Sequence, residues 1–356
     1  MDLTAAEIQQ RLEMLYSSGE TEQARPQAMT KIVAVTLLGS GFEADVFAFS
    51  LNDSEQATSG IHDLILRLYM GQGIAEKAAH EFAAMRRLWD AGYPVPEVFV
   101  FRSQFPPFEQ PFLIMERIQG ASLGLSYWSG LETKRQEAQA TLSQLMAALH
   151  ALDASTLLPD SLLVHSQGPY NFIDHEISAL SELLCQLKGR EPSSFQDVLV
   201  WLAARRSDVP CERLVVVHGD FHPNNVLVRA DGIPFVIDWS NVRLGDCRMD
   251  LAWSRLITQA QAQQDGGMRD LQLYEQLTGA KISGLEYYDV VACARLLFSV
   301  LLSLEFGAAS QGLRPETETR TRQDTSHTLS VADLLHKRTG IQVSDFEERM
   351  SVLIGE

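Results

Sequence analysis

The chain lacks the features that would place it in several large classes of protein. Its four cysteines, Cys185, Cys211, Cys247 and Cys293, contain no CxxC pair, which argues against a zinc site or a redox dithiol. The first residues do not form a basic segment followed by an apolar run, so we expect no secretory leader and a cytoplasmic location. The longest apolar stretch, near Leu296–Leu304, is too short to span a bilayer, and we expect no membrane partner.

Positive charge is also scarce. Lys and Arg total 29 against 46 Asp and Glu, which gives a formal net charge of −17 at pH 7. We therefore do not expect a nucleic-acid partner, whose phosphates would be repelled. The acidic balance fits either a cationic substrate or a solvated acidic surface, and the solvated surface is the more common explanation. The sequence gives no indication of the oligomeric state.

The length and the residue patterns of the first part of the chain indicate a β-rich domain. The chain has 356 residues, 46% of them apolar, which suits a globular protein of two domains. Residues 1–28 are expected to form an N-terminal helix, opened by the capping-box pattern Thr4–Glu7, and a linker. Residues 29–118 combine strand patterns with a helix over Ile74–Asp90. The expected strands are Ile32–Leu38, Val46–Leu51, Asp63–Tyr69, Val98–Arg102 and Phe112–Met115.

Helical periodicity dominates the rest of the chain, residues 119–356, after an expected hinge at Gln119-Gly120. A compact β segment at Leu214–Trp239 interrupts the helices. The polar, charge-mixed stretch Ser310–His327 predicts a mobile loop. The expected helices include Ile177–Leu187, Phe195–Arg205, Asp250–Gln263, Leu271–Thr278 and Tyr287–Phe306.

The chemically most informative segment is His218–Asn225, with the sequence HGDFHPNN. Asp220 precedes Asn225 by five residues, which is the spacing of a kinase catalytic loop. In such loops the Asp orients the acceptor hydroxyl and the Asn binds a metal ion. Another acidic residue, Asp238, follows at the end of a strand pattern.

A predicted hairpin brings Asn225 and Asp238 together. The dipeptide Asp231-Gly232 is a two-residue turn signal between two strand patterns. If these two residues form the turn, paired positions sum to 231 + 232 = 463, and Asn225 lies opposite Asp238 because 225 + 238 = 463. Opposed residues project to one face of a hairpin, so an amide oxygen and a carboxylate would converge as a Mg²⁺ site requires. The alternative is a hairpin with unrelated polar residues, since Asp and Asn are common in turns.

These segments, with Leu244-Gly245-Asp246 and Asp250-Leu251-Ala252, resemble the aminoglycoside phosphotransferase family. The resemblance extends over about Thr36–Phe306. It implies an α+β, bilobal protein-kinase-like fold, with a small β-rich N-lobe and a larger, mainly helical C-lobe that bind ATP or GTP between them. One departure is Cys247, which stands where the family usually has proline.

The resemblance also implies roles for individual residues. Asp220 would be the catalytic residue, and Asn225 and Asp238 would hold Mg²⁺. We expect Asp250 to brace the catalytic segment through hydrogen bonds rather than to bind metal. The histidines of the loop, His218 and His222, are expected to organise it.

The N-terminal domain offers a candidate phosphate loop. Gly39, Ser40 and Gly41 lie between two strand patterns, and Gly39–Val46 resembles a kinase Gly-rich loop. Small residues let backbone N–H groups approach phosphates. A GxG sequence between strands is otherwise often just a turn.

Four further residues of the N-terminal domain are expected to take part in nucleotide binding. The third strand carries Arg67 where kinases have a lysine that holds the phosphates. Glu81 lies on the apolar face of its helix, where a carboxylate is costly without a partner, so we expect it to pair with Arg67. The alternative is a solvated Glu81 at the edge of that face. Met115 and Arg117 lie on a segment that resembles the hinge strand, whose backbone would bind adenine.

The resulting hypothesis is an enzyme that transfers the γ-phosphoryl group of ATP or GTP to a hydroxyl of a small molecule. Members of the family act on aminoglycosides, choline, homoserine, sugars or macrolides, and no motif here identifies the acceptor. A nucleotide-binding pseudokinase with a regulatory role is the alternative, because Arg67 replaces lysine. A protein kinase is disfavoured, since the short interval between Asp238 and Asp250 leaves little room for an activation loop.

Overall fold

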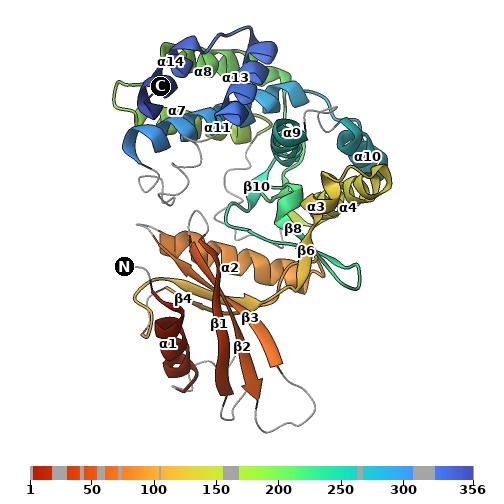
Figure 1. The fold of residues 1–356 in the computed structure, drawn as a ribbon. Coiled ribbons are helices and arrows are strands. Elements are labelled where there is room, and N and C mark those ends of the chain that lie inside the picture. Colours follow the sequence, from red (N-terminus) through yellow and green to blue (C-terminus); the bar gives the residue numbers. More distant parts are fainter. Residues whose placement is uncertain are drawn as a thin grey trace. The chain divides into compact units, whose positions relative to one another are not determined.

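A computed structural model describes most of the chain. The described residues are 3–17, 30–40, 44–53, 61–70, 74–103, 106–154, 168–262, 268–307 and 325–355. The chain divides into two compact units, with the boundary at Gly120. The first unit is the smaller and is β-rich, and the second is mainly helical (Figure 1), which confirms the predicted α+β class.

In the first unit, the described residues form an antiparallel sheet and two helices. Its elements are α1 (Ala5–Ser17), β1 (Thr30–Ser40), β2 (Ala44–Asp53), β3 (Ile61–Tyr69), α2 (Ile74–Asp90), β4 (Val98–Arg102) and β5 (Phe112–Glu116). The strand order is β1-β2-β3-β5-β4 (Figure 1). The bounds of α2 and β4 agree with those predicted from the sequence.

Helix α1 opens with the predicted capping box. The backbone N–H of Thr4 donates to the Glu7 carboxylate at 2.7 Å, and the N–H of Glu7 donates to the Thr4 hydroxyl at 3.3 Å. These bonds satisfy two donors that have no partner inside the helix. The capping box therefore fixes the start of the helix that packs on β1.

One face of the sheet is apolar and carries the core of this unit. The buried cluster joins α1 to alternate residues of β2 and β3, and it includes Ile8, Leu12, Leu15, Phe47, Phe49, Leu51, Leu64, Leu66 and Leu68. Successive side chains of a strand point to opposite faces. Arg67, between Leu66 and Leu68, therefore projects from the face opposite this cluster.

In the second unit, the elements formed by the described residues are mostly helices. They are α3 (Leu123–Tyr127), α4 (Glu132–Ala151), α7 (Asn171–Cys185), α8 (Ser193–Arg205), α9 (Arg248–Ala262), α10 (Met268–Thr278), α11 (Leu285–Phe306), α13 (Ser326–Thr339) and α14 (Ser344–Ile354). Five short strands accompany them: β6 (Gly120–Ser122), β7 (Val215–Val217), β8 (Val226–Arg229), β9 (Pro234–Val236) and β10 (Arg243–Gly245). Strands β6, β8 and β9 form one sheet, and β7 pairs with β10. The predicted loop Ser310–His327 lies outside the described residues up to position 324, and α13 begins at Ser326.

Helix α11 is the centre of the helical unit. It packs against α7, α8, α9, α13 and α14, and it is buried on most of its surface, as expected for a helix that is apolar all round. The helix nevertheless carries charged residues, among them Asp289 and Arg295. Within the described part of the chain, no helix combines the length and apolarity needed to cross a bilayer.

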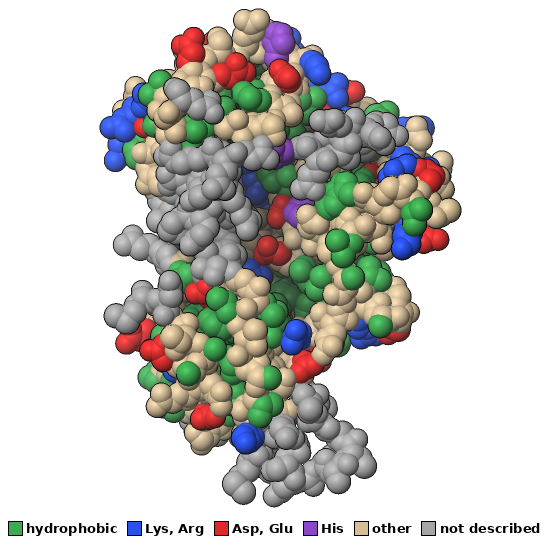
Figure 2. All heavy atoms as spheres, in the orientation of Figure 1, with side chains coloured by type: hydrophobic (Ala, Val, Ile, Leu, Met, Phe, Trp, Pro, Cys, Tyr) green, Lys and Arg blue, Asp and Glu red, His purple; other side chains and the backbone are tan. Residues whose placement is uncertain are grey.

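The acidic charge of the chain is not gathered into one patch on the face shown in Figure 2. Acidic and basic side chains stand next to one another there on the helical unit (Figure 2). Basic side chains on this part of the surface therefore lie within reach of acidic ones, although the chain as a whole carries a net charge of −17.

Candidate active site

Asp220 lies in the segment between β7 and β8, and other side chains hold its carboxylate. The indole Nε1–H of Trp253 donates to Oδ1 at 2.6 Å, and the amide Nδ2 of Asn225 donates to Oδ2 at 3.0 Å. His222 Nε2 lies 3.5 Å from Oδ1. The side chain of Asp220 is still 26% exposed, so an oriented carboxylate remains open to a reactant.

The surroundings of Asp220 favour its charged form. Burial acts to raise the pKa of this carboxyl, but the hydrogen bonds of His222 and Trp253 together lower it below its ordinary value. Asp220 is therefore ionised at neutral pH. An ionised carboxylate is what proton acceptance from a hydroxyl requires.

Asp250 holds the backbone just before Asp220. Its Oδ2 accepts from the N–H of His218 and its Oδ1 from the N–H of Gly219, both at 2.8 Å. His150 Nε2 lies 3.3 Å from Oδ2 of the same, fully buried carboxylate. The predicted bracing bonds of Asp250 are therefore present, and the sequence reasoning missed His150 as its partner.

The two histidines of the loop organise it. His218 Nδ1 accepts from the N–H of Asp220 at 3.2 Å, and Nε2 lies 3.0 Å from the carbonyl of Ile237. The proton of this ring is therefore on Nε2, and the ring ties the loop to the residue before Asp238. His222 Nδ1 likewise accepts from the N–H of Asn224 at 3.2 Å. Both rings are occupied with backbone bonds, as expected of loop-organising residues.

The predicted register of the hairpin is wrong by one residue. Val226 pairs with Val236, so paired positions sum to 462 rather than 463. The N–H of Ile237 donates to the carbonyl of Asn225 at 2.9 Å, so Asn225 lies opposite Ile237 and not Asp238. The cause is a three-residue loop, in which Gly232 has a left-handed φ of 85°, in place of the two-residue turn.

Asp238 has an unusual backbone conformation. Its φ is 66°, in the left-handed region that non-glycine residues seldom adopt and that costs of order 1–3 kcal/mol. Because Asp238 follows β9, this conformation frees its side chain from the alternation of the hairpin. Strain of this kind is typical of functional positions, and the role of Asp238 in metal binding remains a prediction.

Asn225 has an oxygen to offer to a metal ion. Its Nδ2 is used by the carbonyl and the Oδ2 of Asp220, at 2.9 and 3.0 Å, so its Oδ1 points away from them. No donor among the described residues bonds to that oxygen. Amide and carboxylate oxygens suit Mg²⁺, which usually takes few protein ligands and completes its shell with water and phosphate. The donor set of Asn225 and Asp238 therefore fits this ion.

The first unit contains the predicted pair of Arg67 and Glu81. Arg67 Nη1 donates to Glu81 Oε1 at 2.6 Å, and the side chain of Glu81 has no exposed surface, so the solvated alternative is wrong. The hydroxyl of Tyr69 donates to Glu81 Oε2 at 2.8 Å. The sequence reasoning missed Tyr69, although its position two residues after Arg67 places both on one face of β3.

The candidate phosphate loop is described in part. Gly39 and Ser40 end β1 and pair with Val46 and Asp45 of β2, whereas Gly41 lies outside the described residues. Among the described residues, a Cβ added at Gly39 would meet no atom within 4 Å. The contact of this loop with phosphate remains a prediction.

The strand predicted to contact adenine is β5. Met115 is 9% exposed and pairs with Ile65 of β3. The N–H of Arg117 already donates to the carbonyl of Asp63 at 3.1 Å. The backbone N–H of Arg117 is therefore already used within the sheet, and the contact of Met115 and Arg117 with adenine remains a prediction.

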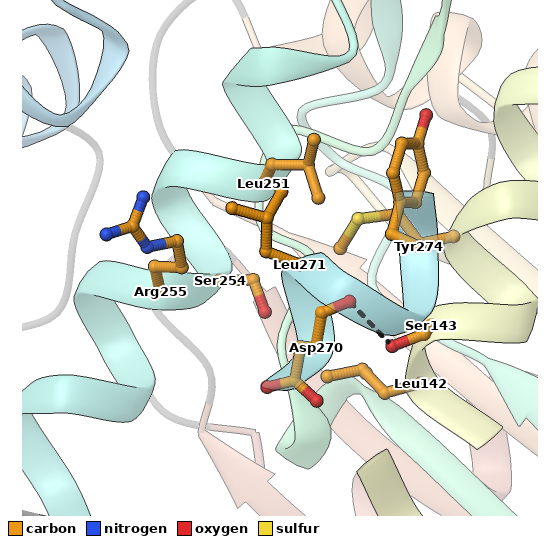
Figure 3. Close-up of a pocket in the computed structure, with 9 residues that line it drawn as sticks. Leu142, Ser143, Leu251, Ser254, Arg255, Asp270, Leu271 and Tyr274 are labelled. Carbon is orange, nitrogen blue, oxygen red and sulfur yellow. Dashed lines mark hydrogen bonds between the residues drawn. The ribbon is translucent and has the colours of Figure 1, made fainter. Parts of the chain in front are cut away.

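A small cavity lies between α4, α9 and α10 (Figure 3). It encloses about 10 Å³, which leaves room for one water molecule at most. The hydroxyl of Ser143 donates to the carbonyl of Asp270 at 3.2 Å at its wall (Figure 3), and the hydroxyl of Tyr127 bonds to the Asp270 carboxylate. This cavity is part of the helix packing and is too small for an acceptor.

The fold is that of the protein-kinase-like small-molecule kinases. A candidate aminoglycoside phosphotransferase from Ralstonia eutropha JMP134 is 17% identical, with a TM-score of 0.65 over 92% of this chain and 98% of its own. Aminoglycoside phosphotransferase APH(4)-Ia is 20% identical, with a TM-score of 0.57 over 87% of this chain and 96% of its own. The likeness to both structures confirms the predicted bilobal kinase-like fold.

The chain belongs to the phosphotransferase enzyme family (APH), which matches residues 34–281. Among curated proteins, acyl-CoA dehydrogenase family member 10 of Mus musculus is 29% identical over 188 residues, which are 51% of this chain and 17% of that protein. Member 11 of Gallus gallus is 22% identical over 182 residues, 51% of this chain and 23% of that protein. The match therefore spans less than a quarter of the length of these relatives.

Proposed function

We propose that the chain is an ATP- or GTP-dependent phosphotransferase that moves the γ-phosphoryl group to a hydroxyl of a small molecule. The observation that carries the proposal is the state of Asp220. Its carboxylate is ionised, is held by Trp253 and Asn225, and is partly exposed. A side chain prepared in this way suits a general base, for which orientation and charge both matter.

In the proposed reaction Asp220 holds the acceptor hydroxyl in line with the γ-phosphorus and takes its proton. A bond forms between the acceptor oxygen and phosphorus, while the bond from phosphorus to the β,γ-bridging oxygen breaks and leaves the nucleoside diphosphate. Charge spreads over the phosphoryl oxygens in this loose transition state, so positioning and electrostatics supply the catalysis. Asn225 and Asp238 would hold Mg²⁺, which neutralises phosphate charge when bound.

The nucleotide is proposed to bind through residues of the first unit. Arg67, fixed by Glu81 and Tyr69, would contact the phosphates, and Gly39, Ser40 and Gly41 would bring backbone N–H groups to them. Met115 and Arg117 would lie beside the base. Similar structures support a nucleotide: a thermostable APH(4)-Ia mutant was solved with AMP-PNP and hygromycin B, an aminoglycoside 2′-phosphotransferase-IIIa mutant with GDP and LicA with AMP.

The alternative of a regulatory pseudokinase arose from Arg67 in place of lysine. Arg67 makes the ion pair with the helix Glu81 that active kinases make with their lysine. The substitution therefore leaves this part of the machinery in place, which favours the enzyme over the pseudokinase.

The deciding experiment combines nucleotide binding with a turnover screen. We expect ATP or GTP with Mg²⁺ to raise the melting temperature, and a panel of hydroxylated metabolites and antibiotics to contain an acceptor that stimulates nucleotide turnover. Asp220→Asn should keep the nucleotide-induced shift and lower turnover by roughly 10²–10⁴-fold. Binding without turnover across the panel would favour the pseudokinase, and no stabilisation by either nucleotide at millimolar concentration would refute both.

A further inference from the structure

Trp253 contacts Asp220 but is not itself a reactant or a proposed ligand of the nucleotide or metal. Its indole N–H donates to Oδ1 of Asp220 at 2.6 Å, a short bond of the kind formed between a donor and a charged acceptor. The indole is a donor with no acceptor role, so it stabilises the ionised carboxylate more than the protonated acid. Trp253 therefore favours both one orientation and one charge state of Asp220.

Helix α9 places Trp253 and Asp250 on one face. They are three residues apart, a spacing that makes side chains neighbours on a helix. Asp250 binds the backbone N–H groups of His218 and Gly219, and Trp253 binds the side chain of Asp220. One turn of α9 thus holds three consecutive residues of the catalytic loop.

Arg295 of α11 supports Trp253 from its ring face. Its guanidinium carbon lies 4.8 Å from the centroid of the indole, and its Nη1 donates to the carbonyl of Gly219 at 3.0 Å. No carboxylate among the described residues forms an ion pair with Arg295. A cation over an indole is attracted to the ring and polarises it, which strengthens the N–H of Trp253 as a donor to Asp220.

We infer that Trp253 and Arg295 form a clamp that positions the Asp220 carboxylate so that its Oδ2 receives the acceptor proton. This inference rests on the proposed function. Oδ1 already faces the N–H of Trp253 and Nε2 of His222, whereas Oδ2 faces only Asn225. Oδ2 therefore keeps an open lone pair, and it lies on the side of the proposed metal ligand Asn225. Trp253 and Arg295 are positioning residues, since neither donates to the reactants.

The test variant is Trp253→Phe, which removes the N–H and keeps an aromatic ring. We expect kcat to fall about 10- to 100-fold, the effect of losing one hydrogen bond to a charged group, with the nucleotide-induced thermal shift unchanged. The loss should appear in kcat with the KM of the acceptor little changed, because Trp253 positions the Asp220 carboxylate and does not bind the acceptor. The matched control is Trp201→Phe. The guanidinium carbon of Arg205 lies 4.6 Å from the centroid of the Trp201 ring, so this tryptophan also faces an arginine. Its replacement should leave the kinetics unchanged.

Two variants of Arg295 test whether its positive charge or the size of its side chain matters for the position of Asp220. We expect Arg295→Met to lower kcat in the same direction as Trp253→Phe, and Arg295→Lys, which keeps a positive charge, to recover part of the loss. The effects of the Trp253 and Arg295 variants should be less than additive, as for residues that act as one unit. Equal losses in the Met and Lys variants would overturn the role of the cation.

A measurement without turnover decides whether the clamp exists. The indole ¹H–¹⁵N resonance of Trp253, identified by its loss in Trp253→Phe, should shift in Asp220→Asn at one fixed pH, because the acceptor of its N–H changes from a carboxylate to an amide. A resonance that Asp220→Asn leaves in place, or wild-type kcat in Trp253→Phe, would overturn the inference. If Trp253→Phe does not fold, Asp220→Asn alone decides the result. An inactive wild-type protein would refute the proposed function, while the indole resonance would still decide on the clamp.

Discussion

Gly219 occupies a position in the catalytic loop that requires both a left-handed backbone conformation and the absence of a side chain. Its φ is 78°, and a Cβ there would lie 2.7 Å from the carbonyl oxygen of Asn241. Its N–H is bound by Asp250 and its carbonyl by Arg295. A shift that relieves the clash would therefore strain two hydrogen bonds that align Asp220.

We expect Gly219→Ala to lower the free energy of unfolding by roughly 1–3 kcal/mol and to lower turnover as well. The measurement is chemical denaturation with an activity assay on the same samples. Gly130→Ala is the matched control, because a Cβ at Gly130 meets no atom within 4 Å and its φ is not left-handed. A Gly219→Ala protein as stable and as active as the control would show that the loop adapts without cost.

Asp246, in the segment after the hairpin, gives a pH-dependent contribution to stability. Burial acts to raise the pKa of this carboxyl, but the hydrogen bonds and charge of Arg248 lower it below its ordinary value. Arg248 Nε and Nη2 donate to the two carboxylate oxygens at 2.9 and 2.6 Å. The folded state therefore holds the proton of Asp246 less tightly than the unfolded state does.

The stability that Asp246 contributes should be complete above pH ~4, the ordinary pKa of an aspartate, and be lost as pH falls through the lowered folded pKa. In urea denaturation, the difference between wild type and Asp246→Asn should therefore shrink as the pH is lowered below ~4. Asp289 is a control of opposite sign, since burial raises its pKa despite Arg255 and Arg338. The difference in unfolding free energy between wild type and Asp289→Asn should therefore change with pH in the opposite direction. If both differences changed in the same direction with pH, the assigned pKa shifts of Asp246 and Asp289 would be contradicted.

At the scale of elements, the sequence predicts best where local signals agree. Helix α2 has the predicted bounds Ile74–Asp90, because its apolar spacing ends at Ala91-Gly92 and prolines follow. The pair of Arg67 and Glu81 could also be predicted, since a carboxylate on an apolar helix face demands a partner on the adjoining strand. Periodicity within α2 fixes the face on which Glu81 lies, and the resemblance to kinases supplies Arg67 as its partner.

Elements whose geometry depends on a choice between turns, or on packing between distant segments, could not be predicted. Asp231-Gly232 is compatible with loops of two or three residues, and the left-handed Gly232 at the third position shifts the whole hairpin by one residue. Trp253 and Arg295 are far from Asp220 in the sequence. Only the packing of α9 and α11 brings them to it, and no local pattern encodes that packing.

The hairpin loop offers a test of the observed register. Gly232 has a φ of 85°, and a Cβ at this position would meet no atom within 4 Å, so substitutions there report the cost of the left-handed conformation alone. We expect Gly232→Ala to destabilise the protein by about 1 kcal/mol, Gly232→Asn by less because Asn tolerates this region, and Gly232→Val by more. Equal stability of the three variants in denaturant titrations would mean that the loop does not require this conformation.

At the scale of the whole molecule, the family match does not cover all of the fold. It ends at residue 281, before the central helix α11, which carries Arg295 and packs against five other helices. Helix α1 precedes the match and contributes Ile8, Leu12 and Leu15 to the core of the first unit. The segments outside the match therefore complete both units, and one of them reaches the catalytic loop.

A ligand that binds only the folded state stabilises the whole chain by mass action, by about 2.7 kcal/mol at a hundred times its Kd. Thermal unfolding thus measures nucleotide binding without an acceptor. Asp238 is proposed to hold the Mg²⁺ that contacts the phosphates, whereas Asp220 faces the acceptor. Loss of the Asp238 carboxylate should therefore weaken nucleotide binding more than loss of the Asp220 carboxylate does.

We expect Mg²⁺ with ATP or GTP to raise the melting temperature of wild type and of Asp220→Ala by similar amounts, and that of Asp238→Ala much less. The reason is that only the Asp238 variant loses a ligand of the ion that offsets phosphate charge. Titrations repeated with EDTA provide the control, since the wild-type shift should then fall to the level of Asp238→Ala. Equal losses of the shift in both variants, or a wild-type shift that persists in EDTA, would refute this division of roles between the two aspartates.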